Sequence, residues 1–125
     1  MLAAAEDAAQ HLRIAYNVAV VDAAGHLVAF ARQDGALIGS IDLAICKART
    51  ARLFSKSTAY LATLAQPGAS LFGIDKSNHG EIVIFGGGIP VFLNEQIVGA
   101  VGTSAGTVEQ DIEVAEAAVS AFRPE

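Results

Sequence analysis

Short apolar runs that are bounded by turn residues give this chain its most regular pattern. Five of these runs have the length of a β-strand. They cover residues 16–21, 26–32, 82–85, 89–93 and 97–101. Four other segments have the alanine content, the capping residues or the amphipathic spacing that is typical of helices. These segments are residues 2–12, 40–54, 57–64 and 108–122.

The connections between these segments predict the fold class. Asn94, Glu95 and Gln96 join the last two runs as a tight hairpin. Thr107 is followed three residues later by Gln110, which is the signature of a capping box at the start of the last helix. The predicted order is α-β-β-α-α-β-β-β-α. We therefore expect an α+β fold in which helices flank a five-stranded antiparallel sheet.

Glycine-rich connections near the last three strands are candidate ligand contacts. Gly86, Gly87 and Gly88 allow positive φ and let another molecule approach the bare backbone. The stretch from Gly102 to Gly106 lies between a strand end and a helix start, where free backbone N–H groups favour oxygen-rich or anionic groups. Glycine is also the ordinary residue of turns, so a purely structural role is the default interpretation of the triple glycine taken alone.

The helix predicted at residues 40–54 has an unusual lysine. Ala44, Ala48 and Ala51 lie along one side at helical spacing, which predicts very close packing against a neighbour. Lys47 falls between Ala44 and Ala51, on the side that should pack. Its ammonium either extends outward to solvent or points into a pocket.

Length, charge and composition limit the class of protein. A chain of 125 residues is long enough for a buried core, and we expect one domain over residues 1–125. The formal net charge of −5 argues against nucleic acid and acidic membrane surfaces as partners. The residues are 53% hydrophobic and 17% charged, so the chain has more apolar surface than a monomer hides. We therefore expect a homo-oligomer, from a dimer to an octamer.

The cellular location is predicted from what the sequence does not contain. No apolar run reaches the ~20 residues that span a bilayer. The N-terminus lacks the basic and apolar pattern of a secretory leader. Cys46 is the single cysteine, which excludes an internal disulfide and a cysteine-based zinc site. We therefore expect a cytoplasmic protein without a membrane partner.

Several separated motifs resemble the GlcG/HbpS-like family, and together they cover nearly the whole chain. The motifs are Val-Val-Asp-Ala-Ala-Gly-His-Leu-Val-Ala-Phe at 20–30, Ser-Ile-Asp-Leu-Ala at 40–44, Lys-Ala-Arg-Thr-Ala at 47–51, Gly-Gly-Gly-Ile-Pro-Val at 86–91, Val-Gly-Ala-Val-Gly-Thr-Ser-Ala-Gly-Thr at 98–107 and Glu-Gln-Asp at 109–111. The family includes the secreted haem-binding protein of streptomycetes and the C-terminal domain of PduO-type corrinoid adenosyltransferases.

The resemblance implies a profilin-like, GlcG-type α+β fold, a symmetric assembly and haem as a candidate ligand. Family members often have Asn-Gly-Gly where this chain has Asn78-His79-Gly80, so His79 is a side chain that the family pattern does not require. The adenosyltransferase chemistry of PduO belongs to its other domain, so the resemblance does not imply that activity for this chain.

The first functional hypothesis is binding of haem or a related tetrapyrrole. Haem requires an apolar slot, an axial ligand and cations for its propionates. The apolar candidates are Phe30, Phe72, Phe85 and Ile89. His79 and His26 are the candidate metal ligands, and Glu81 is close enough in sequence to orient a ring nitrogen of His79. His11 lies near the end of the first helix, where it fits a helix-dipole partner better.

The second hypothesis is an enzyme that acts on a small oxygenated metabolite, a carboxylate or a carbonyl compound. Lys47 would pair with the carboxylate, and the N–H groups of Gly86–Gly88 and of the Thr103-Ser104 turn would bind its oxygen atoms. His79 and Glu81 would transfer a proton. No nucleophile elbow, Walker loop or dinucleotide motif specifies the reaction.

The third hypothesis is a non-catalytic accessory protein whose role is assembly, for which the alanine-lined helix and the apolar surplus suffice. Under the first two hypotheses the ligand would lie within one subunit or between subunits. The residues expected around it are Lys47, Asn78, His79, Gly86–Gly88 and Thr103.

Overall fold

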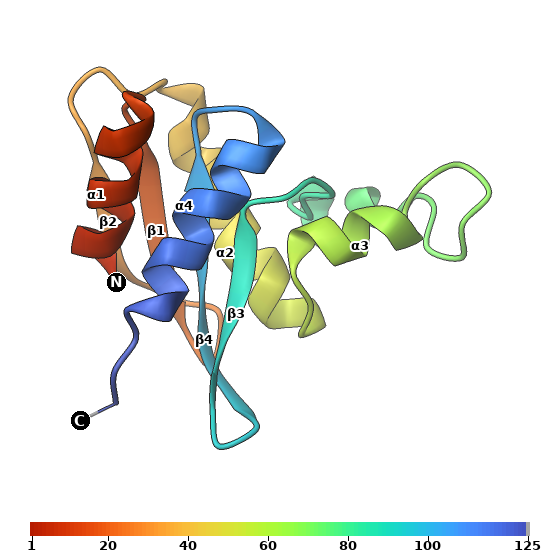
Figure 1. Cartoon of the computed structure of the whole chain (residues 1–125). Helices are drawn as coiled ribbons and strands as arrows, with labels where there is room; N and C mark the ends of the chain where they lie inside the picture. The colour runs from red at the N-terminus through yellow and green to blue at the C-terminus, as the bar shows by residue number, and fades with distance from the viewer. Residues whose placement is uncertain (125) are drawn as a thin grey trace.

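The computed structural model describes residues 1–124, which form an antiparallel sheet with helices on both faces (Figure 1). The sheet has four strands in the order β2-β1-β4-β3. The strands are β1 Asn17–Asp22, β2 Leu27–Arg32, β3 Gly88–Leu93 and β4 Gln96–Ser104. The helices are α1 Leu2–Leu12, α2 Gly39–Phe54, α3 Thr58–Leu64 and α4 Val108–Ser120. Two 3₁₀ turns, η1 Ile74–Lys76 and η2 Asn78–Gly80, precede β3. The predicted α+β class and antiparallel sheet are confirmed.

The predicted strand at residues 82–85 is wrong, and the sheet therefore has one strand fewer than expected. The Val83 N–H donates to the Thr50 hydroxyl of α2 over 3.1 Å, and not to a neighbouring strand. Ile82 and Val83 are buried. A buried apolar connection and a buried strand have the same hydrophobic pattern, so the pattern alone does not separate them.

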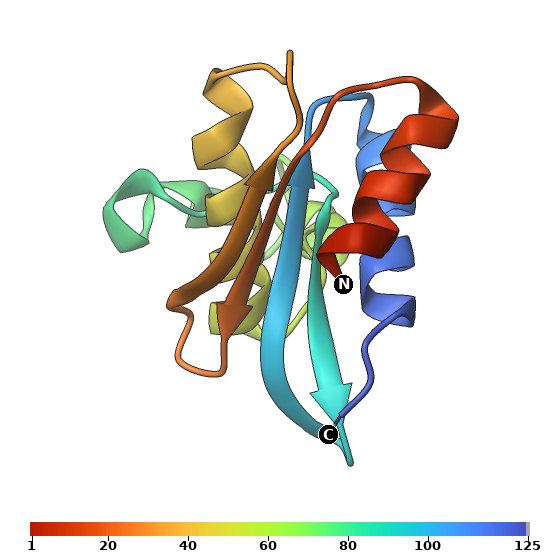
Figure 2. The same ribbon diagram turned by 90° about the vertical axis from the view of Figure 1, so that its left-hand side faces the viewer.

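The sheet has a separate core on each face (Figure 2). Val18 and Val20 of β1 point toward α1 and α4, while Ala19 and Val21 point toward α2. This alternation is the two-residue period of a strand that is buried on both sides. The fold therefore has three layers, with α2 on one side of the sheet and α1 and α4 on the other.

The alanine side of α2 packs directly on the sheet, as its spacing predicts. Ala44, Ala48 and Ala51 are fully buried. A Cβ added at Gly102 of β4 would overlap the carbonyl oxygen of Ala44 and would lie 2.5 Å from the backbone nitrogen of Ala48. Gly102 is thus required for the close approach of helix and strand.

The predicted hairpin and the caps of α3 and α4 are confirmed, whereas α2 begins after Ile38 without the side-chain cap expected from Ser40 or Asp42. Asn94 and Glu95 both have positive φ between β3 and β4, which is the geometry of a tight two-residue turn. The Thr107 side chain accepts from the Gln110 N–H, and the Gln110 side chain accepts from the Thr107 N–H, which completes the capping box of α4. The Ser57 side chain caps α3 by accepting from the Tyr60 N–H over 3.1 Å.

The helix α3 and the residues after it extend away from the sheet (Figure 1). We refer to residues 56–73 as the arm. It carries two of the most exposed aromatic side chains, Tyr60 at 54% and Phe72 at 66%. Within residues 1–124, no helix is both long and apolar enough to cross a membrane.

Candidate functional site

Lys47 is fully buried and points into the interior of the protein. Its Nζ lies 2.7 Å from Oδ2 of Asp111 and 3.0 Å from the carbonyl oxygen of Thr103. Lys47 belongs to α2 and Asp111 to α4, so the ion pair connects the helical layers on the two faces of the sheet. Burial lowers the pKa of the Lys47 ammonium, and the hydrogen bond to Asp111 opposes that shift.

Asp111 gathers hydrogen bonds from several segments. Its Oδ1 accepts from the Tyr16 hydroxyl over 2.8 Å and from the Gly106 N–H over 3.0 Å. The Ala105 N–H approaches the same oxygen at 3.3 Å. Burial raises the pKa of the Tyr16 phenol, and the hydrogen bond to Asp111 adds to this increase. These contacts compensate the desolvation of a buried carboxylate.

The sequence predicts that the turn after β4 offers free N–H groups to a bound anion. In the structure these N–H groups bind a side chain of the protein itself, the Asp111 carboxylate. Thr103 and Ser104 belong to β4 and not to a loop. The N–H groups beyond them, at Ala105 and Gly106, donate to the Asp111 carboxylate. The Thr103 hydroxyl donates to the Asp111 carbonyl over 2.6 Å, and the Ser104 hydroxyl donates to Ser40 over 3.1 Å.

The triple glycine packs against Lys47. A Cβ at Gly87, whose φ is 125°, would lie 2.8 Å from the Lys47 Nζ and 2.7 Å from the Thr103 carbonyl oxygen. A Cβ at Gly88 would overlap the Lys47 carbonyl, and one at Gly86 would lie 2.6 Å from Ile112. Close packing against backbone atoms alone therefore accounts for glycine at positions 87 and 88. Their predicted contact with a ligand stays a prediction.

Phe85 covers the ion pair from the outside. The Lys47 Nζ lies 5.1 Å from the centroid of the Phe85 ring, within the range of a cation–π interaction. The Phe85 side chain is 41% exposed. This aromatic ring therefore lies at the boundary between the buried ammonium and solvent.

Asn78, His79 and Glu81 lie together on the exposed segment before β3. Asn78 and His79 have φ values of 51° and 62°, which are uncommon for residues with a side chain. Glu81 pairs with Arg49 of α2 over 2.7 Å, so it does not orient the His79 ring. Within residues 1–124 the His79 ring makes no hydrogen bond. His79 is thus an exposed imidazole that is free to contact a ligand.

His26 lies apart from the other predicted site residues. Its backbone N–H donates to the Asp22 carboxylate in the turn between β1 and β2. In the sheet, Asp22 pairs with Gly99, whereas Val18 near the other end of β1 pairs with Thr103. His26 therefore belongs to the end of the sheet that is opposite Lys47. The structure brings Lys47, Gly86–Gly88 and Thr103 together, and it separates His26 from them.

Comparison with known proteins identifies the family of this chain. The family model described as "Haem degrading protein HbpS-like" matches residues 1–120. This chain belongs to the HbpS-like family. The resemblance that the sequence motifs indicate is confirmed.

Relatives of this HbpS-like protein share both sequence and fold. The uncharacterised 15.0 kDa protein of the dhaT-dhaS intergenic region of Citrobacter freundii is 43% identical over 122 residues, which are 98% of this chain and 86% of that protein. The corrinoid adenosyltransferase PduO of Salmonella typhimurium is 38% identical over 95% of this chain, which spans only 35% of PduO. A solved PduOC:Heme complex has a TM-score of 0.94 at 37% identity and covers 97% of this chain and 88% of its own.

The predicted site does not include Asp111 or Tyr16, although the sequence contains a signal for Asp111. On α4, Asp111 shares the buried side with Val114, Ala115 and Ala118. An acid on the apolar side of one helix and Lys47 on the packing side of another are each costly to bury alone. In the ion pair, each charge compensates the cost of burying the other.

In the part of the chain that the structure describes, no group of three or more His, Cys, Asp or Glu side chains converges to hold a metal ion. A surface pocket of about 310 Å³ lies at the end of α1 and the end of β2. Its lining residues are Gln10, Arg13, Ile14, Ala15, Gln33 and Asp34. None of these residues belongs to the predicted site.

Proposed function

We propose that this HbpS-like protein binds haem or a related tetrapyrrole, with His79 as the axial ligand. The observation that carries the proposal is an exposed imidazole that has no hydrogen-bond partner within residues 1–124 and that follows the arm, with its exposed aromatic rings, along the chain. The proposal is supported by the family description and by the similarity to the PduOC:Heme complex.

The backbone around His79 favours a ligand role. Asn78, His79 and Gly80 have positive φ in succession, and left-handed residues other than glycine are strained. Such strain is common at ligand contacts, where the surrounding structure holds a side chain in a fixed direction. A neutral imidazole nitrogen is a usual axial ligand of haem iron.

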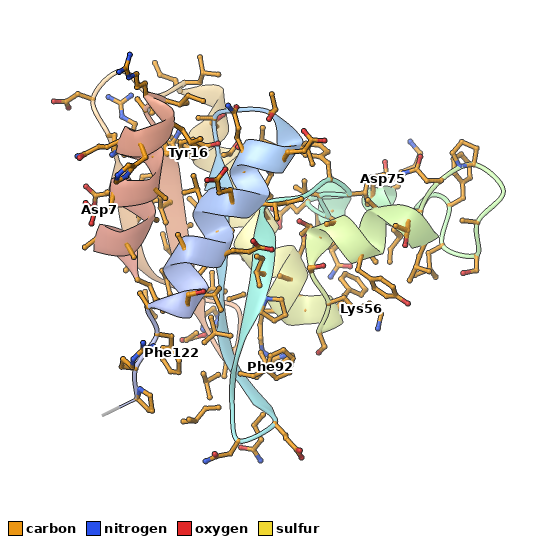
Figure 3. All side chains as sticks on the ribbon, viewed as in Figure 1. Asp7, Tyr16, Lys56, Asp75, Phe92 and Phe122 are labelled. Carbon is orange, nitrogen blue, oxygen red and sulfur yellow. The ribbon has the colours of Figure 1, made fainter. Side chains whose placement is uncertain are left out.

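The arm supplies the apolar surface and a cation. Tyr60, Leu71 and Phe72 are large exposed side chains on the arm. Lys56 lies over the Tyr60 ring at 5.8 Å, and Figure 3 places it on the outside of the arm. A porphyrin has an apolar face and negatively charged propionates, so aromatic rings with an exposed ammonium match its chemistry.

Assembly into a homo-oligomer and a cytoplasmic location are parts of the same proposal. A flat ring that lay on the arm of one subunit would keep one face in solvent. A second copy of the chain would cover that face, which agrees with the large fraction of hydrophobic residues.

The alternative in which Lys47 and His79 act together on a metabolite receives no support from their placement. Lys47 is enclosed by Asp111, Thr103 and Phe85, whereas His79 is exposed. A proton transfer that used both side chains would need them at one surface.

A haemin titration that is followed by absorbance tests the proposal. We expect the wild type to give a saturable Soret shift at one haem per subunit or per subunit pair. His79→Ala should weaken binding at least about tenfold, because it removes the bond to iron. His26→Ala is the matched control, since it removes an exposed histidine at the opposite end of the sheet and should bind as the wild type does. Unsaturable binding, or equal binding by both variants and the wild type, would overturn the proposal.

A further inference from the structure

The hydrogen bonds of the Lys47 ammonium leave one of its donors without an acceptor. An ammonium has three N–H groups. Two of them have oxygen partners, in Asp111 at 2.7 Å and in Thr103 at 3.0 Å. The Phe85 ring also lies near the ammonium, and it attracts the charge but accepts no conventional hydrogen bond. An oxygen atom in place of the ring would accept the third hydrogen bond of the ammonium.

Phe85 is well placed to move without disturbing the sheet. It lies in the irregular connection between η2 and β3, and no strand pairing depends on it. Its side chain is 41% exposed, so turning it outward breaks only the packing of the covered part.

A backbone donor lies beside the same ammonium. The α-carbon of Gly87 is so near that a Cβ on it would be 2.8 Å from the Lys47 Nζ. Within residues 1–124, the Gly87 N–H donates no hydrogen bond, whereas the Gly87 carbonyl accepts from Thr103 over 2.9 Å. The Lys47 ammonium is therefore close to the Gly87 backbone, whose N–H donates no hydrogen bond within residues 1–124.

The charge of the site selects an uncharged ligand. Lys47 and Asp111 neutralise each other, so a carboxylate ligand would meet an equal charge on Asp111 without a spare cation. The surrounding side chains are apolar: besides Phe85, Ile112 and Val108 lie close to Gly86. A small carbonyl compound has an oxygen to accept from the Lys47 ammonium and no charge to desolvate.

We propose that Lys47 is a covered reactive amine, that Phe85 is its lid, and that the site takes a small uncharged aldehyde or ketone and forms an imine with it. Asp111 first accepts a proton from the ammonium, which leaves a neutral amine. The amine nitrogen bonds to the carbonyl carbon, and its surplus proton moves to the carbonyl oxygen. The proton on Asp111 then protonates this hydroxyl group, which leaves as water. The product is a protonated imine beside a carboxylate, so the charge pair is restored.

This site is separate from the proposed haem ligand. It uses Lys47, Asp111, Gly87 and Phe85, and it does not involve His79. If this protein bound haem without forming the imine, or formed the imine without binding haem, one proposal would therefore stand and the other would fail.

Reductive trapping tests the imine. The intact protein is incubated with acetaldehyde and sodium cyanoborohydride, which reduces an imine to a stable ethyl group, and the modified lysines are mapped by peptide mass spectrometry. Lys56 and Lys76 are exposed and serve as internal standards in the same sample. We expect Lys47 to be modified in the wild type and at least about tenfold faster in Phe85→Ala, which lacks the lid.

Two controls separate lid opening from unfolding and from simple anion binding. Val21→Ala weakens the core between β1 and α2 and leaves Phe85 in place, so it reports any labelling that passes through the unfolded chain. An excess of acetate should leave Lys47 labelling unchanged. Lys47 that stays unmodified in both the wild type and Phe85→Ala, while Lys56 and Lys76 react, would overturn the proposal. An equal acceleration in Val21→Ala and Phe85→Ala would also overturn it.

Discussion

Lys47 and Asp111 come from helices on opposite faces of the sheet, and their charged groups meet at 2.7 Å in the interior. The pair joins two cores that the sheet otherwise separates. Its neighbours, Tyr16 and the backbone at Gly106, complete the hydrogen bonds of the carboxylate. A buried charge that loses its partner is costly, so this contact should dominate the response of the fold to substitution.

Removal of the acid should be the most damaging single change at this pair. Asp111→Asn removes the countercharge of the buried Lys47 ammonium, and we expect a loss of about 3–5 kcal/mol in the free energy of unfolding. Lys47→Met should cost less, because the carboxylate keeps the Tyr16 hydroxyl and two backbone N–H groups. Urea denaturation measures both. Losses below about 1 kcal/mol in both variants would show that the pair does not stabilise the fold.

The fall of the free energy of unfolding at alkaline pH should depend on Tyr16. The phenol titrates near 10.0 in the unfolded chain, and in the folded protein its pKa is raised by burial and by Asp111. Above pH 10 the folded state therefore binds more protons than the unfolded state, and stability falls as pH rises. Lys47 has the opposite sign, because its folded pKa lies below 10.5 and its contribution rises with pH up to that value.

Tyr16→Phe isolates the phenol in this dependence. The variant loses a hydrogen bond and should be less stable at every pH. Its free energy of unfolding should nevertheless fall less steeply above pH 10 than that of the wild type. Urea midpoints between about pH 9 and pH 11 give the two slopes. Parallel slopes would mean that Tyr16 does not titrate differently in the folded and unfolded states.

The triple glycine should tolerate no side chain at its centre. Gly87→Ala adds a strained φ and a Cβ that would lie 2.8 Å from the Lys47 Nζ, and we expect a loss of about 3 kcal/mol or more. Gly68→Ala is the matched control, because Gly68 also has a positive φ of 86° but nothing lies within 4 Å of its added Cβ. That variant should lose only about 1 kcal/mol. Equal losses in the two variants would assign the whole effect to backbone strain.

Much of the fold follows from local signals in the sequence. The turn at Asn94 and Glu95, the capping box of Thr107 and Gln110 and the alternating strand β1 depend on neighbouring residues, and all were predictable. The segment at residues 82–85 was not, because its apolar side chains pack against α2 and its Val83 N–H bonds to Thr50. That choice depends on which surface is near in space, and the local pattern carries no such information.

The candidate site could be predicted only in part, for the same reason. Spacing placed Lys47 on the packing side of its helix, and the structure confirms that it is buried. Its partner Asp111 is 64 residues away in sequence, so only the fold shows that the two side chains meet. The N–H groups after β4 were expected to bind an external anion, but the Asp111 carboxylate accepts from them.

The measurement that tests the haem proposal most directly is a change of ligand at residue 79. The ferric haem complexes of wild type, His79→Cys and Ser77→Cys are compared by absorbance and electron paramagnetic resonance. If His79 binds the iron, His79→Cys replaces nitrogen with thiolate and changes both spectra, because the axial ligand sets the electronic state of the iron. Ser77→Cys, two residues away, should keep the wild-type spectra, and the native Cys46 is buried in all three proteins. Identical spectra for His79→Cys and the wild type would contradict the assignment of His79 as the haem ligand.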